Sequence, residues 1–501
     1  MSAGAGITAK PNAGEKLGFW LLVTLVFVSR AFFLDMGFGR PDAWRVGVTG
    51  KFWVLTGEYT PSRPPGFPLL EMISASSYAV FGQSPLTWLA TNALSCLIFC
   101  VSVAAVWILA RKWGVRSPLL AAGIYAFCPL NWVYSVETID YVWTASFTLL
   151  SVLMLESERK QASFWSGVLL GLAASARFFA AVQLIPLLIL AWTKRRSIWD
   201  PLMLFCAFAL VSFGFYFVIL SRVADWSEYI DWFHELNRVS SRMAEIRGGI
   251  LARRFLIPAS GLFGPLATVA LIVVGLAGLR SAARRLRAGD RGMWTAATLT
   301  FFAMAPYLWH LHPNYWIPAT GFLLILLART TDVRLFAVAG ALVVAANFPW
   351  WQANVEGLRL MSPQGRSRGI ENFARGLAPY QNETVFQETQ VRSLVFGSTE
   401  ELLRTDLPSD WVIMAGLRLP MIQFLVDDMR RVETPLADGT AIDVWKSPSR
   451  GPGYRYMISP TQARKLIESG YQVRYIPGLE NTYSATYGTH PADVAGVEPL
   501  Y

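Results

Sequence analysis

The chain has 501 residues, of which 53% are hydrophobic and only 16% are charged, and its mean hydropathy is +0.38. A soluble enzyme of this length carries more charge, and here the apolar residues form long blocks, so the composition excludes an ordinary soluble protein. The net charge is +10, but the basic residues lie largely in short loops between the blocks. That distribution is typical of membrane topology rather than of nucleic-acid binding.

Eleven apolar segments are candidates to cross a bilayer core of about 30 Å, which takes about 20 helical residues. The first covers Leu17–Leu34, and Arg177 divides the long block Phe164–Trp192 into two. The other eight lie at Leu86–Ala110, Ser117–Tyr134, Thr138–Leu155, Ile198–Leu220, Ile257–Leu279, Trp294–Trp309, Tyr315–Ala328 and Val333–Trp350. We therefore predict a mainly α, polytopic transmembrane bundle over residues 1–351.

The short loops predict the orientation of this bundle. Lys and Arg are concentrated in the loops at 111–116, 159–160, 194–196, 280–291 and 329–334, whereas the short loops near Val136 and Leu311 contain neither. Basic loops stay in the cytoplasm, so the N-terminus is predicted there, and an odd number of spans places the C-terminus outside. The long outer loops also contain basic residues, mixed with acidic ones. They weaken the difference in Lys and Arg between the two sides but do not reverse the predicted orientation.

Two outer segments are predicted to be helices that do not span. Pro64–Gly82 begins with Pro-Pro-Gly and is interrupted by Glu71, which indicates an interfacial or re-entrant helix. Asp225–Ile246 has aromatic and apolar residues at helical spacing, which indicates an amphipathic helix on the outer face.

Residues 352–501 are polar and are predicted to form an extracytoplasmic α/β domain. Strand-like runs lie at Trp411–Ala415, Ala441–Trp445 and Tyr471–Ile476, helix-like runs at Leu419–Arg430 and Thr461–Ser469, and a hairpin turn at Thr434–Thr440. Asp427 and Asp428 are interpreted as a solvated face of the first of these helices.

The first outer loop contains two carboxylates beside a rigid turn. Asp35 ends the first span and Asp42 follows seven residues later. Three cations come after them: Arg45, Lys51 and Arg63. The prolines of Ser62–Pro68 stiffen the backbone around Arg63, which favours a cationic site around Asp42. Ordinary solvated loop carboxylates are the alternative.

Other polar groups lie at predicted outer ends of spans. Glu137 and Asp140 are three residues apart and share a face if that turn is helical, although either could simply cap the helix. Arg177 interrupts an apolar run, where a charge is costly and usually functional, with snorkelling to the interface as the alternative. His310, His312 and Tyr315 occupy a short outer loop with no evident third metal ligand, so we assign no metal site; aromatic-belt residues with incidental His are the alternative.

The acid in the first outer loop, followed by Gly-x-Tyr-x-x-Ser-Arg-Pro-Pro-Gly-Phe-Pro, resembles the polytopic GT-C glycosyltransferases, among them the protein O-mannosyltransferases, the aminoarabinose transferases and their bacterial relatives. The resemblance covers roughly the first 350 residues. It implies an integral protein of the bacterial cell membrane that transfers a hexose or pentose from a polyprenyl-phosphate carrier at the outer face. A single displacement would invert the anomeric carbon.

The resemblance also implies residue roles. Pro-Asp-Ala-Trp-Arg is similar to the family's acidic motif, so Asp42 is the expected catalytic base, and Asp35 is a possible stand-in because Ala43 replaces a second acid. Asp140 and Glu137 are expected to bind substrate, and Asp140 is expected to contact the donor sugar, or Mg²⁺ or Mn²⁺ together with Asp42. The expected substrate and phosphate contacts are Arg63, Arg45, Arg177, His310, His312 and Tyr315, with Asn314 in place of a frequent arginine.

The implied partners are a polyprenyl-phosphate-linked sugar, a glycan, lipid or protein acceptor, and membrane lipids, with no nucleic acid. Two alternatives belong to other classes. A transporter or flippase for the same lipid predicts charged residues in mid-span, whereas here they cluster at one face. A non-catalytic membrane scaffold leaves the acidic and cationic loop unexplained.

Overall fold

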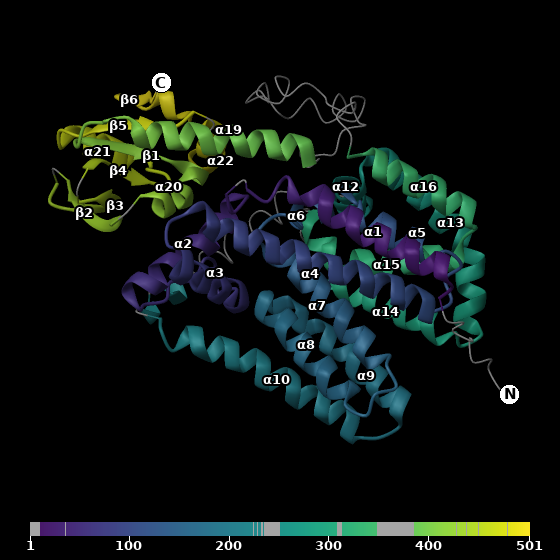
Figure 1. The fold of residues 1–501 in the computed structure, drawn as a ribbon. Helices are drawn as coiled ribbons and strands as arrows, with labels where there is room; N and C mark the ends of the chain where they lie inside the picture. The colour runs from purple at the N-terminus through teal and green to yellow at the C-terminus, as the bar shows by residue number, and fades with distance from the viewer. Residues whose placement is uncertain are drawn as a thin grey trace.

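The structure is a computed structural model. It describes residues 11–35, 37–223, 225–227, 229–231, 234, 251–307, 313–347, 385–426, 428–436, 438–448, 450–477 and 479–500. The described chain is mostly helical, with one small sheet near the C-terminus. Figure 1 shows this sheet at one end of the helical bundle, beside α2 and α3, and the start of α1 at the other end.

The bundle is built from apolar helices. Proline is the first residue of α2 to α6 and of α13. A backbone N–H at that position has no partner within the helix, so a proline, which has no N–H, loses no hydrogen bond there. The helices are α1 (Ala13–Ala31), α2 (Pro41–Thr56), α3 (Pro68–Phe81), α4 (Pro85–Lys112), α5 (Pro118–Ala126), α6 (Pro129–Tyr134), α7 (Asp140–Leu155), α8 (Ala162–Ala176), η1 (Phe178–Gln183), α9 (Leu184–Arg195), α10 (Trp199–Leu220), α12 (Leu251–Phe263), α13 (Pro265–Arg287), α14 (Arg291–Met304), η2 (Ala305–Tyr307), η3 (Pro313–Trp316), α15 (Ile317–Thr330) and α16 (Val333–Ala345).

Within the described ranges, three helices are long and apolar enough to cross a membrane: Pro85–Lys112, Trp199–Leu220 and Leu266–Arg287. Four shorter apolar helices accompany them, at Asp140–Leu155, Ala162–Ala176, Phe178–Lys194 and Val333–Ala345. The expected division near Arg177 is confirmed, because α8 ends at Ala176. The count of eleven spans stays a prediction.

Two predicted spans are wrong as continuous helices. Ser117–Tyr134 is divided into α5 and α6 before Pro129, and Ile257–Leu279 is divided between α12 and α13 at Gly264. At the first break the Ala126 carbonyl accepts a hydrogen bond from Arg30 at 2.5 Å. Arg30 is fully buried rather than snorkelling, and the rings of Phe99, Phe127 and Trp132 surround its guanidinium. This arginine therefore supplies a donor at the interrupted helix.

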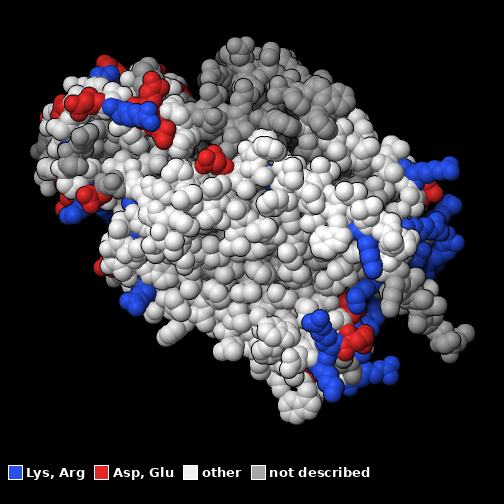
Figure 2. Space-filling model, in the orientation of Figure 1, with Lys and Arg blue, Asp and Glu red and all other residues white. Residues whose placement is uncertain are grey.

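The surface charge is uneven along the bundle. In Figure 2 the middle of the visible face is almost uncharged, and Lys and Arg gather at the end away from the C-terminal sheet. The last turns of α4 and α13, which are basic, belong to that pattern. An uncharged band bounded by a basic end agrees with an integral membrane protein, and the predicted orientation of the termini stays a prediction.

The C-terminal sheet has six strands in the order β2-β3-β4-β1-β5-β6. β1 pairs in parallel with β4 and β5, and β5 pairs in parallel with β6; β2, β3 and β4 are joined by antiparallel pairs. The elements are α19 (Val385–Arg404), β1 (Trp411–Met414), η5 (Gly416–Arg418), α20 (Leu419–Leu425), β2 (Arg430–Pro435), β3 (Ala441–Ser447), β4 (Arg450–Arg455), α21 (Pro460–Glu468), β5 (Gln472–Tyr475), α22 (Glu480–Tyr487), η6 (Pro491–Asp493) and β6 (Val497–Pro499).

The predicted strands and the hairpin at Thr434–Thr440 are confirmed, since β2 and β3 pair across that turn. The predicted helix Leu419–Arg430 is wrong in its second half. Val426 leaves the helical conformation, Asp428 has a φ of +55°, and Arg430 begins β2. Asp428 therefore follows the helix instead of lying on its solvated face.

The C-terminal α/β region (residues 385–500) packs directly on α2. Phe424 of α20 contacts Phe38 and Trp44 edge to face, with ring centroids 5.0 Å and 5.7 Å apart. Phe396 of α19 stacks on Trp44 at 6.0 Å. This aromatic cluster fixes α2 between the sheet and the bundle, and α2 carries the acid predicted to be catalytic.

Candidate functional site

Asp42 lies in the first turn of α2, which begins at Pro41. Its side chain is 30% exposed, so solvent can reach the carboxylate. The Oδ1 atom accepts a hydrogen bond from Nη2 of Arg63 at 2.5 Å and lies 3.3 Å from Nη1 of Arg45, one helical turn away. The predicted association of Asp42 with these two arginines is therefore seen in the structure.

Arg63 extends from the loop between α2 and α3. Burial alone would lower the pKa of its guanidinium, but Asp42 and, with smaller effect, Tyr141, Tyr315 and Asp140 outweigh burial and raise it. The side-chain contact of Arg63 is with Asp42. Burial lowers the pKa of Arg45, with Asp42 opposing that shift.

A second acid and arginine meet at the ends of α7 and α8. Asp140 is the first residue of α7, and Arg177 directly follows α8 in an extended conformation. Their side chains are only 5% and 9% exposed, and they form an ion pair and hydrogen bond through Nη1 and Oδ2. The guanidinium of Arg177 also lies over the rings of Tyr141 and Tyr315, 4.5 Å and 4.7 Å from their centroids. The structure thus brings Asp140, Arg177 and Tyr315 together.

Glu137 belongs to a third contact, with an arginine that the sequence analysis missed. Arg40 Nε lies 3.7 Å from Oε1 of the fully buried Glu137, and Arg40 also contacts the ring and hydroxyl of Tyr134. Gly39 makes this approach possible, because a Cβ there would lie 2.7 Å from Cγ of Glu137. The only available signal was the position of Arg40, immediately before the Pro-Asp motif.

Two residues of the first loop lie elsewhere. Asp35 is exposed and accepts a hydrogen bond from Nε1 of Trp88 at 3.1 Å; among the described residues it has no ion pair. Lys51 is wrongly placed by the sequence analysis: its Nζ donates to the carbonyls of Gln423, Phe424 and Val426 at 2.7–3.1 Å. At about 100° per residue, nine residues rotate Lys51 to the opposite face of α2 from Asp42.

His310 and His312 lie outside the described residues, so their predicted contacts stay predictions. No group of three metal-ligating side chains occurs in the ranges that the structure describes. Asp42 and Asp140 are each already paired with an arginine, and carboxylates neutralised in this way are poor cation ligands. A divalent cation shared between Asp42 and Asp140 therefore stays a prediction, and the mechanism below uses none.

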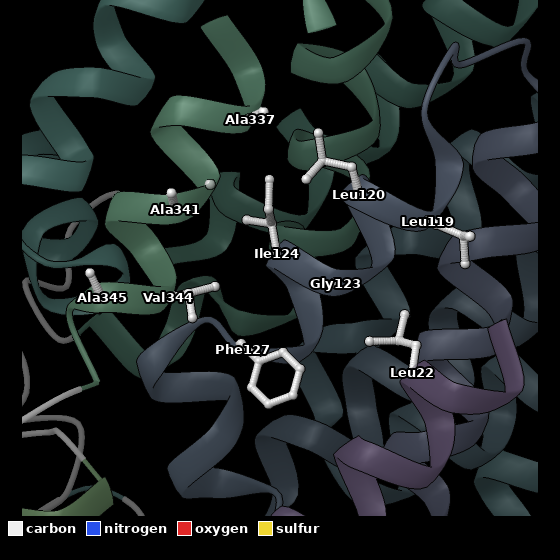
Figure 3. A pocket seen from close by; sticks show the side chains of 11 residues that line it. Leu22, Leu119, Leu120, Gly123, Ile124, Phe127, Ala337, Ala341, Val344 and Ala345 are labelled. Atoms are coloured by element: carbon white, nitrogen blue, oxygen red, sulfur yellow. The ribbon is translucent and has the colours of Figure 1, made fainter. Parts of the chain in front are cut away.

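An apolar groove of about 550 Å³ opens between α1, α5 and α16 (Figure 3). Leu22, Leu120, Ile124 and Val344 are among its lining side chains, and no charged residue lines it. Such a surface suits hydrocarbon and has no group that could act on a sugar.

Comparison with known proteins finds a family model that matches less than half of the chain. Residues 78–308 match the model of glycosyltransferase family 87. This range includes Asp140 and Arg177 but neither Asp42, Arg63 nor Tyr315. No curated protein matches the sequence.

Solved structures of similar fold are also found. The structure of ArnT from Cupriavidus metallidurans bound to undecaprenyl phosphate is 14% identical, covers 83% of this chain and 85% of its own, and has a TM-score of 0.51. The apo state of the same protein is also 14% identical, covers 82% and 84%, and has a TM-score of 0.49. The apo oligosaccharyltransferase of Archaeoglobus fulgidus is 12% identical, covers 83% and 64%, and has a TM-score of 0.43.

The fold is thus similar to that of the polytopic GT-C membrane glycosyltransferases, and the resemblance inferred from the sequence is confirmed. More narrowly, the matching family model is that of glycosyltransferase family 87. Together with the apolar helices, these findings support a glycosyltransferase that is an integral membrane protein.

Proposed function

We propose that this protein transfers a sugar from a polyprenyl-phosphate carrier to an envelope acceptor at the outer face of the membrane. The observations that carry the proposal are two acid–arginine contacts, Asp42 with Arg63 and Asp140 with Arg177. The match to a glycosyltransferase family model and the fold shared with ArnT, which binds undecaprenyl phosphate, support it.

Asp42 is the proposed general base. Its partial exposure leaves room for an acceptor hydroxyl, whose proton the carboxylate takes as the oxygen attacks the anomeric carbon. The new C–O bond forms while the bond from that carbon to the carrier phosphate breaks, and the electron pair leaves with the phosphate oxygen. This single displacement inverts the anomeric carbon.

Arg63 and Arg177 are the proposed phosphate contacts. Charge develops on the phosphate as the bond breaks, and two guanidinium groups already held in place stabilise it without reorganising. Arg177 is the more firmly held, by Asp140 and by two tyrosine rings. Because the Asp140 carboxylate is engaged with Arg177, we assign it the orientation of that arginine in place of the sugar contact expected from the sequence.

This mechanism requires the site to face the side of the membrane where the carrier-linked sugar is presented. The basic ends of α4 and α13 point away from the C-terminal α/β region in the bundle, which supports placing the N-terminus in the cytoplasm and that region outside. Topology reporters fused after α4 and after β6 test this placement; a reporter active in the cytoplasm after β6 would contradict it.

The direct test of the function is Asp42→Asn in membranes that contain the inserted protein. Loss of a general base typically lowers a rate by about 10²–10⁴-fold, and transfer from a radiolabelled polyprenyl-phosphate sugar should fall by that order. Glu58→Gln is the matched control, since it neutralises an exposed acid that directly follows the helix of Asp42. Wild-type transfer by Asp42→Asn would refute the assignment.

A further inference from the structure

Glu71, in the first turn of α3, is a fully buried carboxylate that the proposed mechanism does not use. Its oxygens accept four hydrogen bonds, all from the loop that precedes the helix. Oε1 accepts from the amide of Ser62 at 2.8 Å and from its hydroxyl at 2.5 Å. Oε2 accepts from the hydroxyl of Tyr59 at 2.5 Å and from the amide of Phe67 at 3.0 Å. The Glu71 side chain therefore binds three residues of the loop: Tyr59, Ser62 and Phe67.

The same loop is held from its other side. The hydroxyls of Tyr216 and Tyr229 donate to the carbonyls of Gly66 and Pro65 at 3.5 Å and 3.2 Å. Gly66 has a φ of +102°, and a Cβ there would lie 2.4 Å from the hydroxyl oxygen of Tyr59, so only glycine fits. The backbone from residue 59 to residue 67 consequently has little freedom.

Arg63 lies in the middle of this restrained loop. Its carbonyl accepts from the amide of Gly66 at 2.5 Å, and its side chain reaches Asp42. Burying a carboxylate is expensive, and an apolar side chain of similar size would pack α3 without that penalty. The cost of burying the Glu71 carboxylate is explained if its hydrogen bonds serve to hold the loop in one particular geometry.

We propose that Glu71 is a positioning residue that fixes the loop at 59–67 so that the guanidinium of Arg63 meets both Asp42 and the carrier phosphate. Glu71 touches no substrate and acts through Arg63. This inference rests on the proposed function, which gives Arg63 its role.

A double-mutant cycle tests the inference. Glu71→Gln keeps the size of the side chain but places an amide N–H₂ against donors that now meet a carboxylate oxygen. A misplacement of about 1 Å can lower a rate about 10²-fold, so we expect kcat/KM for the carrier-linked sugar to fall about 10- to 100-fold. In an Arg63→Ala background Glu71→Gln should lower kcat/KM by less than about twofold, because the group that it positions is gone.

Two further variants make the cycle decisive. Tyr59→Phe removes only one donor to Glu71, so we expect a smaller loss of kcat/KM with the same dependence on Arg63. This variant keeps the test valid even if Glu71→Gln accumulates poorly. Leu70→Ala destabilises α3 from a buried apolar position without removing a hydrogen bond to Glu71, and its effect should be equal in both backgrounds.

The outcomes separate this inference from the proposed function. Equal losses from Glu71→Gln, or from Tyr59→Phe, with and without Arg63 would show a purely structural role and overturn the inference, while the proposed function would stand. If Arg63→Ala itself transfers sugar at the wild-type rate, the assigned role of Arg63 fails, and the inference fails with it.

Discussion

Asp140 and Arg177 form a nearly buried ion pair in which each residue stands at the helix end that favours its charge. Asp140 is in the first turn of α7, where the helix dipole is positive, and Arg177 follows the last turn of α8, where the dipole is negative. The two helices pack extensively against each other, so the pair is set by their alignment. The arginine is thereby presented in a defined place before any substrate binds.

The ion pair predicts a non-additive pattern of stability. Asp140→Asn leaves Arg177 buried without its acid and should lower the free energy of unfolding by about 3–5 kcal/mol. Arg177→Met should cost a similar amount, whereas the double variant should lose less than the sum, because no buried charge is left alone. Thermal unfolding of the four proteins in detergent measures this. Strict additivity would show that the two groups are not coupled.

Lys51 predicts how the C-terminal α/β region is attached. Lys51→Met removes the cation that binds three carbonyls at the end of α20 and leaves them buried, which should lower the free energy of unfolding by about 1–3 kcal/mol. Protease accessibility of that region should rise in parallel. Lys112→Met is the control, because Lys112 is exposed and binds a single carbonyl. An equal effect of both variants would contradict a special role of Lys51.

Asp290 predicts a dependence of stability on pH. Burial alone would raise the pKa of this carboxyl, but the amide of Met293 and the guanidinium of Arg329 outweigh burial and hold it below its usual value. The resulting stability is present above the unfolded-state pKa, about 4, and is lost as the pH falls through the lower folded-state value.

Asp290→Asn should therefore lower the melting temperature at pH 7, and the difference from wild type should shrink at pH 3. Asp332→Asn is the comparison, since Asp332 is also a helix cap but is more exposed, and among the described residues no arginine side chain pairs with it. A difference that is unchanged between the two pH values would contradict the prediction.

The sequence was informative wherever local pattern determines structure. Apolar blocks predicted most helices, and three of the six strands of the C-terminal sheet, β1, β3 and β5, were predicted as strand-like runs, together with the turn between β2 and β3. The association of Asp42 with Arg63 was predicted from the stiff turn that holds the arginine, whereas Asp140 and Arg177 were each identified singly. The pairing of Asp140 with Arg177 depends on how α7 and α8 pack, and one sequence without relatives does not contain that information.

The misplaced and missed residues have physical reasons. Lys51 was grouped with Asp42 because residues 35–68 were treated as a loop, whereas α2 turns the two side chains to opposite faces. Glu71 was taken only as a polar interruption, because its importance depends on hydrogen bonds from four loop groups that converge in space. The predicted span Ser117–Tyr134 ignored Pro129, which ends α5 early.

The position of α2 couples the two ends of the chain. Asp42 faces the bundle from one side of this helix, and on the other side Lys51 is bonded to Gln423, 372 residues further along the chain. Because Asp42 and Lys51 lie on one short helix, the C-terminal α/β region takes part in setting the place of the Asp42 carboxylate.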